Sequence, residues 1–441
     1  MIEKILRFIE KLIPKKLYKL GQPVYHFLLA IAGVVIYRFP AKGMNVIGVT
    51  GTKGKTSTAN FIHSVLNNDK NKTGLISTAN IKIGDKSFPN KYHMSMPGRF
   101  IIQKYLREMK NAGCKNVVLE VTSEGIKQWR HLGLFLDVAI FTNLSPEHLA
   151  SHGGSFVKYR ETKMRIFRKN IWNKLKLVII NTDDENSSYF SDAANGVEKI
   201  NFSLNHVSNI LENESGISFD FENENYNLNI NGRFNIYNAL PAILLAKKYN
   251  LKQEQIKEGL LELNLIPGRM EIINEGQDFK VIVDYAHEKL SMNNLLDSAK
   301  NLKKNEDNKI IIVLGGDGGG RDEQRLYDMG EVVGKKANLV IVANSDPYFD
   351  DEMILAKKIG DEAEKQGKKY NENLFIIIDR NEAIKKAISL AKSGDVVLLA
   401  TRGSLNTMSW KGQKIKSDDR DIARESLLEL MHRQAQQSNK N

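Results

Sequence analysis

The sequence predicts an α/β protein with two domains built on mostly parallel sheets, preceded by a short helical N-terminal segment. Short apolar runs alternate with amphipathic helical stretches from about residue 44 onward, and strands separated by helices form parallel sheets covered on both faces. The 441 residues suffice for about three domains of ordinary size. Pro267-Gly268 is the best-marked hinge. We therefore expect a segment at 1–42 and domains at 43–267 and 268–441.

Composition limits the class of protein. The 41% hydrophobic residues, 26% charged residues and 9 prolines exclude a disordered or collagen-like chain. The single cysteine, Cys114, excludes a disulfide framework and a zinc site built from several cysteines, and it fits a reducing compartment such as the cytoplasm. The net charge of +12 favours anionic partners, which we expect to be small molecules and not nucleic acid.

Residues 1–42 carry eight basic and two acidic residues, a net charge of +6. Apolar residues at helical spacing predict an amphipathic helix over 2–13 that ends at Pro14. Residues 21–37 contain no formal charge, which is short for a bilayer-spanning helix, and no signal-peptide cleavage site is present. Three interpretations stay open for this segment: packing on the next domain, a hairpin or anchor at the membrane surface, and a true span.

Buried strands are expected where apolar runs occur between helical stretches. The runs of the first domain are 45–50, 116–121, 137–141 and 177–181, and those of the second are 281–284, 309–314, 338–342, 374–378 and 396–400. The second set predicts a Rossmann-like sheet. Residues 184–230 are polar and rich in Asn, with short alternating runs at 216–221 and 226–230, which predicts a small antiparallel flap on the first sheet.

The run at 45–50 leads into a glycine-rich loop and then a helical stretch, the arrangement of a phosphate-binding P-loop. Glycines let backbone N–H groups approach phosphate oxygens, and the helix N-terminus adds positive potential. The predicted nucleotide-binding residues are Gly51, Thr52, Lys53, Gly54, Lys55, Thr56 and Ser57. Among them, Lys55 can reach the β- and γ-phosphates, and the Thr56 hydroxyl can ligate Mg²⁺. A second glycine-rich run, 315–320, fits a substrate cradle and a flexible turn equally well.

The wording Gly-Val-Thr-Gly-Thr-Lys-Gly-Lys-Thr-Ser-Thr at 48–58 resembles the ATP loop of the Mur ligases, which add amino acids stepwise to the peptidoglycan precursor. The likeness is greatest to the members that add the third residue, and it extends over about 44–430. Further similar runs are Ser95-Met96-Pro97-Gly98, Glu120-Val-Thr-Ser, Thr142-Asn143-Leu144-Ser145-Pro146-Glu147-His148, Gly232-Arg-Phe-Asn235, Pro267-Gly-Arg269-Met-Glu271 and Val283-Asp284-Tyr-Ala-His287. So many matches in one order make the resemblance specific.

The resemblance implies an ATP-driven amide ligase. A substrate carboxylate would attack the γ-phosphate, and the amine of an amino acid would then attack the acyl phosphate. The resemblance implies that the catalytic residues are Lys55, Lys163, His148 and Arg269. Two Mg²⁺ ions would be held by Thr56, Glu120, His148 and an N-carbamylated Lys163, and ATP would also contact Asn235, Arg269 and Asp284. The muramoyl-peptide would be held by Ser95, Met96, Thr122, Gln128 and Arg130. A cytoplasmic monomer, with possible membrane contact through residues 1–42, completes this expectation.

Two features depart from the family pattern. About 42 residues precede the loop, too few for the family's uridine-binding domain, so whether the acceptor carries UDP or a lipid stays open. Ser345-Asp346-Pro347-Tyr348 and Thr401-Arg402-Gly403-Ser404-Leu405 stand where diaminopimelate-adding members read Asp-Asn-Pro-Arg and Gly-Lys-Gly-His-Glu. We expect Asp346, Pro347 and Tyr348 to line the amino-acid pocket and disfavour diaminopimelate. A folylpolyglutamate synthase-like ligase and a non-catalytic or partner-dependent subunit are the alternatives.

Overall fold

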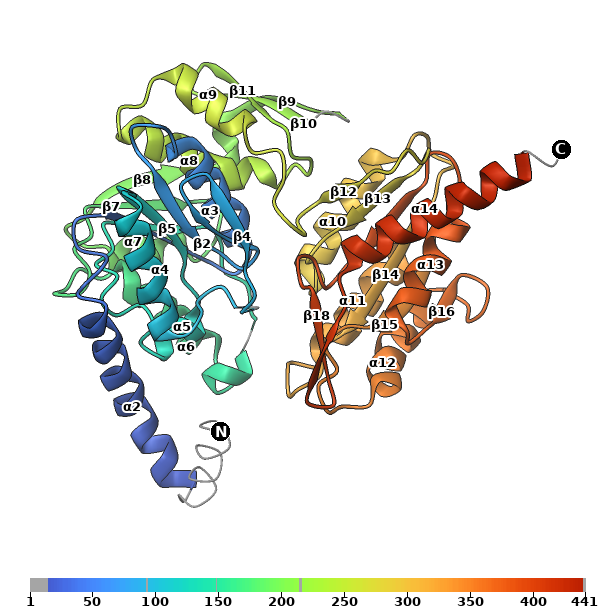
Figure 1. Cartoon of the computed structure of the whole chain (residues 1–441), viewed down its shortest axis with the longest axis horizontal. Helices are drawn as coiled ribbons and strands as arrows, with labels where there is room; N and C mark the ends of the chain where they lie inside the picture. The colour runs from blue at the N-terminus through green and yellow to red at the C-terminus, as the bar shows by residue number, and fades with distance from the viewer. Residues whose placement is uncertain (1–14, 93, 148, 214–215, 439–441) are drawn as a thin grey trace. The chain divides into compact units, whose positions relative to one another are not determined.

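A computed structural model describes residues 15–92, 94–147, 149–213 and 216–438 (Figure 1). The chain divides into two compact units: the first comprises the chain up to Leu204 together with Tyr237–Gly259, and the second comprises Asn205–Ile236 and Leu260–Asn441. The helix predicted at 2–13 and the predicted metal ligand His148 lie outside the described residues.

The first unit is built on an eight-stranded sheet of order β4-β3-β2-β5-β1-β6-β7-β8. Its strands are β1 (Asn45–Thr50), β2 (Thr73–Ile76), β3 (Asn80–Ile83), β4 (Lys86–Pro89), β5 (Asn116–Glu120), β6 (Val138–Phe141), β7 (Leu177–Asn181) and β8 (Glu198–Phe202). The strands from β2 to β8 in this order pair in parallel, and β3 pairs antiparallel with both β2 and β4. The predicted parallel sheet is therefore confirmed.

The helices of the first unit are α2 (Lys15–Ile36), α3 (Lys55–Leu66), α4 (Arg99–Asn111), α5 (Ser123–Lys127), α6 (Phe156–Met164) and α7 (Ser187–Ala193), with most of α8 (Asn235–Lys248) and α9 (Gln253–Leu261). Apolar side chains of α4, α6 and α7 join one core with every second residue of the central strands, such as Val117 and Leu119. The helix α3 contacts β1, β2 and β5 and follows β1 directly, so the strand and the helix position the loop between them.

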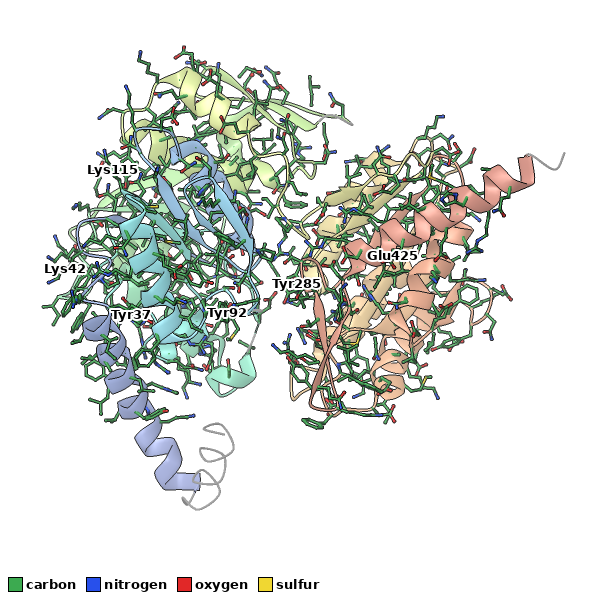
Figure 2. The ribbon with its side chains drawn as sticks, viewed as in Figure 1. Tyr37, Lys42, Tyr92, Lys115, Tyr285 and Glu425 are labelled. Carbon is green, nitrogen blue, oxygen red and sulfur yellow. The ribbon has the colours of Figure 1, made fainter. Side chains whose placement is uncertain are left out.

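The uncharged N-terminal run forms part of α2, whose last residues precede Tyr37, labelled in Figure 2. This helix lies beside α4 (Figure 1), and Arg107 donates to the Tyr37 carbonyl at 2.6 Å. Helix packing, one of the three interpretations, thus holds for one face of α2. Among the described residues, no helix combines the length and apolar character needed to cross a bilayer.

The second unit contains a six-stranded sheet of order β12-β13-β17-β14-β15-β16, parallel except for β12. Its strands are β12 (Glu271–Ile273), β13 (Lys280–Val283), β14 (Ile310–Gly316), β15 (Leu339–Asn344), β16 (Leu374–Ile376) and β17 (Val396–Leu399). Helices α10 (Lys289–Leu302), α11 (Gln324–Lys336) and α12 (Glu352–Lys365) cover one face, and α13 (Arg380–Leu390) and α14 (Asp419–Ser438) cover the other. A hairpin, β18 (Thr407–Trp410) and β19 (Gln413–Lys416), follows β17.

The polar region, predicted as a flap on the first sheet, instead forms a separate three-stranded antiparallel sheet, β9 (Val207–Asn213), β10 (Gly216–Phe221) and β11 (Glu224–Leu228), which belongs to the second unit. The segment after β11 bonds to a later part of the same unit: the Asn229 amide donates to the Leu261 carbonyl at 2.7 Å and to Asn264 Oδ1 at 2.8 Å. The chain therefore passes between the units three times, where the sequence suggested a single passage at 267–268.

Candidate active site

The predicted phosphate loop lies at the carboxyl end of β1, between β5 and β6. In the parallel ladder Val49 pairs with Glu120, and Thr50 pairs with Phe141. In the strand order, β2 and β5 lie on one side of β1, and β6, which comes later in the chain, lies on the other side of β1. Ligands of open α/β sheets bind at such a reversal of strand order. The loop, Glu120 and the residues after Phe141 therefore share one edge of the sheet.

Two glycines of the loop are required by the close approach of neighbouring groups. Gly51 has φ +150°, and a Cβ there would lie 2.0 Å from Thr142 Oγ1. Gly54 has φ +80°, and its Cβ would lie 2.4 Å from Asn238 Oδ1. The loop backbone is held by Asn143, whose carbonyl and side-chain oxygens accept hydrogen bonds from the N–H groups of residues 52 and 53, each at 2.8 Å. The loop is thus preformed.

Lys55 and Lys163 converge on the loop backbone. Lys55 Nζ donates to the carbonyls of Gly51 at 3.0 Å and Thr52 at 2.7 Å. Lys163 Nζ, from the last turn of α6, donates to the same Gly51 carbonyl at 2.8 Å. Two amino groups from distant parts of the sequence therefore meet at one carbonyl oxygen.

The environment of Lys163 favours its neutral form. Its side chain is only 2% exposed. Burial lowers its pKa well below the ordinary value, and the charge of Lys55 lowers it further against the opposing effect of Glu147. The Tyr159 ring lies 4.8 Å from Nζ, and Glu147 pairs with Lys53 at 2.9 Å. Lys163 is therefore buried inside the site, whereas a lysine on a helix is usually an exposed, charged side chain.

Glu120 and Thr56, two of the predicted metal ligands, are both buried. Glu120 Oε1 accepts the backbone N–H of Thr78 at 2.6 Å, and Oε2 accepts its hydroxyl at 2.9 Å. The Thr78 hydroxyl lies 2.5 Å from Ser95 Oγ, which places one predicted acceptor residue near the Glu120 carboxylate. Among the described residues, no three His, Cys, Asp or Glu side chains form a cluster able to hold a metal ion.

The predicted acceptor residues form a connected network. Arg130 donates through Nε and Nη2 to Gln128 Oε1, at 3.2 and 2.7 Å, and also to the Met96 carbonyl. The Met96 sulfur accepts the N–H of Thr122 at 3.4 Å. Arg99, at the start of α4, donates to the Gln128 carbonyl and contacts His26 of α2. The structure therefore brings Met96, Thr122, Gln128 and Arg130 together.

Three further predicted nucleotide contacts lie in the second unit. Asp284 accepts the N–H groups of Met270 and Ala286, each at 2.8 Å, so its carboxylate holds the start of β12. Arg269 stacks on Tyr285 (labelled in Figure 2), with its guanidinium carbon 4.6 Å from the ring centroid. Arg269 and Asp284 are thus neighbours. Asn235 is buried and donates to the Asn231 carbonyl at 2.7 Å as α8 begins.

The predicted amino-acid pocket gathers at the carboxyl ends of β14 and β15. Arg321 pairs with Asp317 at 2.7 Å and donates to the Tyr348 hydroxyl at 3.3 Å. The glycine-rich turn before Arg321 packs tightly, since a Cβ at Gly318 would lie 2.5 Å from the Pro347 carbonyl. Asp346, however, accepts the N–H of residue 409 in β18 at 2.7 Å, so one of its oxygens is engaged within the protein.

Sequence reasoning gave no role to several residues that shape the site. Thr142 and Asn143 hold the loop, Asn238 packs against Gly54, Thr78 orients Glu120, and Tyr159 lies against Lys163. A signal existed for the first two, because Thr142 and Asn143 follow a predicted strand whose carboxyl end belongs to the same sheet edge. No comparable signal marked Thr78, which reaches Glu120 only after β2 has paired with β5.

Comparison with known proteins agrees with these features. Residues 49–246 match the family model of the Mur ligase middle domain, and residues 268–403 match that of the Mur ligase glutamate ligase domain. UDP-N-acetylmuramyl-tripeptide synthetase of Treponema denticola is 34% identical over 419 residues, covering 89% of this chain and 78% of that protein. The UDP-N-acetylmuramoyl-L-alanyl-D-glutamate–2,6-diaminopimelate ligase of Caldanaerobacter subterraneus is 33% identical over 402 residues, covering 89% and 80%.

Solved structures show the same architecture. A UDP-N-acetylmuramoyl-L-alanyl-D-glutamate–2,6-diaminopimelate ligase aligns with a TM-score of 0.59 and 25% identity, over 89% of this chain and 79% of that one. A folylpolyglutamate synthase of Mycobacterium tuberculosis, solved with ADP and AMPPCP, aligns with a TM-score of 0.68 at 16% identity, over 84% and 91%; that likeness concerns the fold alone. Because both domain models match and these relatives are more than 30% identical over most of their length, the chain belongs to the Mur ligase family.

Proposed function

We propose that this Mur ligase joins an amino acid to the carboxylate of a muramoyl-peptide through an acyl phosphate. The acceptor carboxylate oxygen bonds to the γ-phosphorus of ATP as the bond to the β-phosphate oxygen breaks, which releases ADP. The neutral amine of the amino acid then attacks the acyl carbon, the carbon–oxygen bond to phosphate breaks, and phosphate leaves with the former carboxylate oxygen. The protein contributes positioning and charge neutralisation.

The observation that carries this proposal is the meeting of Lys55 and Lys163 at the Gly51 carbonyl. The loop is preformed, its glycines leave space for close approach, and Lys55 stands where it can contact the β- and γ-phosphates. A Mg²⁺ ion at the phosphates suits Thr56 and Glu120, because Mg²⁺ takes one or two carboxylates together with phosphates and water. When bound, that ion would neutralise charge on the transferred group.

We assign Lys163 as the carbamate-forming residue. Only a neutral amine attacks CO₂, and burial beside Lys55 lowers the pKa of Lys163 in that direction. The reaction bonds Nζ to the carbon of CO₂ and releases a proton, so the amine becomes an anion. That anion would lie beside Lys55 and could ligate a second Mg²⁺ together with His148, which the resemblance assigns to the same ion.

Both substrates have candidate contacts. The network of Met96, Thr122, Gln128 and Arg130 presents amide and guanidinium groups that suit an anionic muramoyl-peptide. In the second unit, Arg321 lies beside Tyr348. By the resemblance described above, Tyr348 occupies the position where diaminopimelate-adding Mur ligases have an arginine. We propose that Arg321 binds the carboxylate of the incoming amino acid and that Tyr348 and Pro347 form the wall of its pocket.

Further assignments follow from the same likeness. Arg269, Asp284 and Asn235 would contact the nucleotide, and Ser95 would contact the acceptor next to Glu120. The enzyme would act as a monomer on its small-molecule substrates, with residues 1–42 in peripheral contact with a membrane.

Phosphate release tests the function. The chain is incubated with ATP, Mg²⁺, UDP-linked muramoyl-dipeptide and each amino acid in turn, and product is identified by mass. We expect release that requires both the acceptor and one or a few amino acids, and that is lost in Lys55→Ala but retained in Lys176→Ala, a change at a 72% exposed side chain. Turnover of a pteroyl-glutamate instead, or no amide product with any acceptor, would contradict the proposal.

A further inference from the structure

The helix α2 has two apolar sides, of which one is packed. Ala30 and Val34 are each 2% exposed, and Val34 lies against Gly133, where a Cβ would come within 2.3 Å of it. The Phe27 ring meets Trp129 edge-on with centroids 5.2 Å apart. This packed side fixes the orientation of the helix on the first unit, so the opposite side is also fixed.

The opposite side exposes large apolar side chains to solvent. Val24 and Leu28 are each 59% exposed, Val35 is 53%, Ile36 is 64% and Tyr25 is 50%. Positions 24, 28 and 35 follow helical spacing and form a single stripe, flanked by 25 and 36. Contiguous exposed apolar patches of this kind mark interaction sites, whereas apolar residues scattered singly need no explanation. We call these five residues the outer face of α2.

Basic residues precede and follow the uncharged run of α2 in the sequence. Residues 21–37 contain no Asp, Glu, Lys or Arg. Lys15, Lys16 and Lys19 begin the helix, and Arg38 and Lys42 follow it. A helix with an apolar face, and with basic residues before and after it in the sequence, complements a surface that is apolar below and anionic above, which is the boundary of a lipid bilayer containing acidic headgroups.

We propose that the outer face of α2 lies flat in the headgroup region of an anionic bilayer and holds the first unit at that surface. The 22-residue helix is about 33 Å long, and when it lies flat its five outer side chains reach the acyl boundary together. The packed side remains on α4 throughout. This inference extends the peripheral contact proposed above, but it depends on exposure and charge and not on the ligase chemistry.

Vesicle co-sedimentation tests the proposal with the full chain. The probes are vesicles of phosphatidylcholine with about a third phosphatidylglycerol, and vesicles of phosphatidylcholine alone. We expect binding to the anionic vesicles that weakens as salt is raised. The variant Leu28→Glu/Val35→Glu should bind at least about tenfold less, because burial of one Leu-sized side chain is worth that factor. Lys15→Gln/Lys16→Gln/Lys19→Gln should weaken binding to anionic vesicles only.

The matched control is Ile171→Glu/Leu211→Glu, which adds the same charge at two other apolar side chains, 80% and 67% exposed; it should bind like the parent. Equal binding by the α2 variant and the parent, or no binding of the parent to anionic vesicles, would overturn the proposal. A concentration-dependent dimer of the parent that Leu28→Glu/Val35→Glu dissociates would also overturn it, since a second copy would then cover the face. ADP release by every variant, measured without vesicles, separates this outcome from failure of the ligase assignment.

Discussion

Asp419 supports the loops of the amino-acid pocket from inside the second unit, and Asp419→Asn tests that support. Its carboxylate receives Arg380 through two hydrogen bonds, Nε at 3.1 Å and Nη2 at 2.6 Å, and Arg402 Nε lies 3.7 Å away. Arg402 in turn donates to the Ser345 carbonyl at 3.0 Å. All three charged side chains are 3% exposed or less. The substitution preserves shape but removes the carboxylate charge from the buried ion pair of Arg380, and it leaves Arg402 with Asp346, 3.6 Å away.

Removing one partner of a buried ion pair costs about 3–5 kcal/mol, because the remaining charge stays buried without compensation. For a unit of this size, each kcal/mol lowers the melting temperature by about 2–4 °C, so the second unit should melt about 10 °C lower. The matched control is Asp297→Asn. Its ion pair with Lys336 is as short, 2.6 Å, but its side chain is 63% exposed, and such pairs contribute at most about 1 kcal/mol.

Urea unfolding followed by tryptophan fluorescence would measure the free energy of unfolding of both variants, and thermal melts would measure their melting temperatures. Trp410 reports on the second unit, because it lies in β18. At a temperature where Asp419→Asn is still folded, KM for the amino acid should rise while KM for ATP changes little, since Arg402 holds the residue before Asp346. A loss below about 1 kcal/mol, equal to that of Asp297→Asn, would refute the argument that this cluster supports the pocket.

Three further predictions concern the first unit. Lys55→Ala should abolish ADP formation with an unchanged melting temperature, and near-normal turnover would remove the loop from the mechanism. Lys163→Ala should lose most activity, and short carboxylic acids should restore part of it by replacing the carbamate anion; mass spectrometry that finds no CO₂ adduct on the active parent would contradict this. His63 is buried and its pKa is lowered to about 3, mainly by burial and then by Lys82, so the folded protein excludes a proton that the unfolded chain binds below about pH 6.5. The free energy of unfolding should therefore fall by about 2 kcal/mol between pH 7.5 and pH 5 because of this group alone. In urea unfolding, His63→Gln should lose about 2 kcal/mol less than the parent over the same pH range. An identical pH dependence of the two proteins would show that His63 is charged when folded.

The strands that the sequence predicted are short apolar or alternating runs with clear flanks. The structure has β1 at Asn45–Thr50, β7 at Leu177–Asn181 and β10 at Gly216–Phe221, as expected, and the other expected strands differ by one or two residues at their ends. The sequence did not predict β2, β3, β4 and β8 of the first sheet. The loop and the helix that follows it were equally clear in the sequence. Gly51 and Gly54, which indicated the loop, take positive φ values that favour glycine.

What the sequence did not reveal depends on contacts between distant segments. Lys163 could be read as a surface lysine until α6 placed it against Gly51. The engagement of Asp346 depends on the hairpin of β18 and β19, 63 residues further on. The outer face of α2 was also hidden, because the apolar run of 21–37 supplies both its packed and its exposed side, and only packing on α4 separates them.

The transfer of a carboxylate oxygen to phosphate tests the central claim most directly. The acceptor carboxylate is labelled with ¹⁸O, and turnover is run in unlabelled water with ATP, Mg²⁺ and the amino acid that gives product. A reaction through an acyl phosphate transfers one ¹⁸O atom to each phosphate released, because the bond from the acyl carbon to that oxygen breaks when the amine attacks. Phosphate without ¹⁸O, formed alongside the amide, would contradict the account.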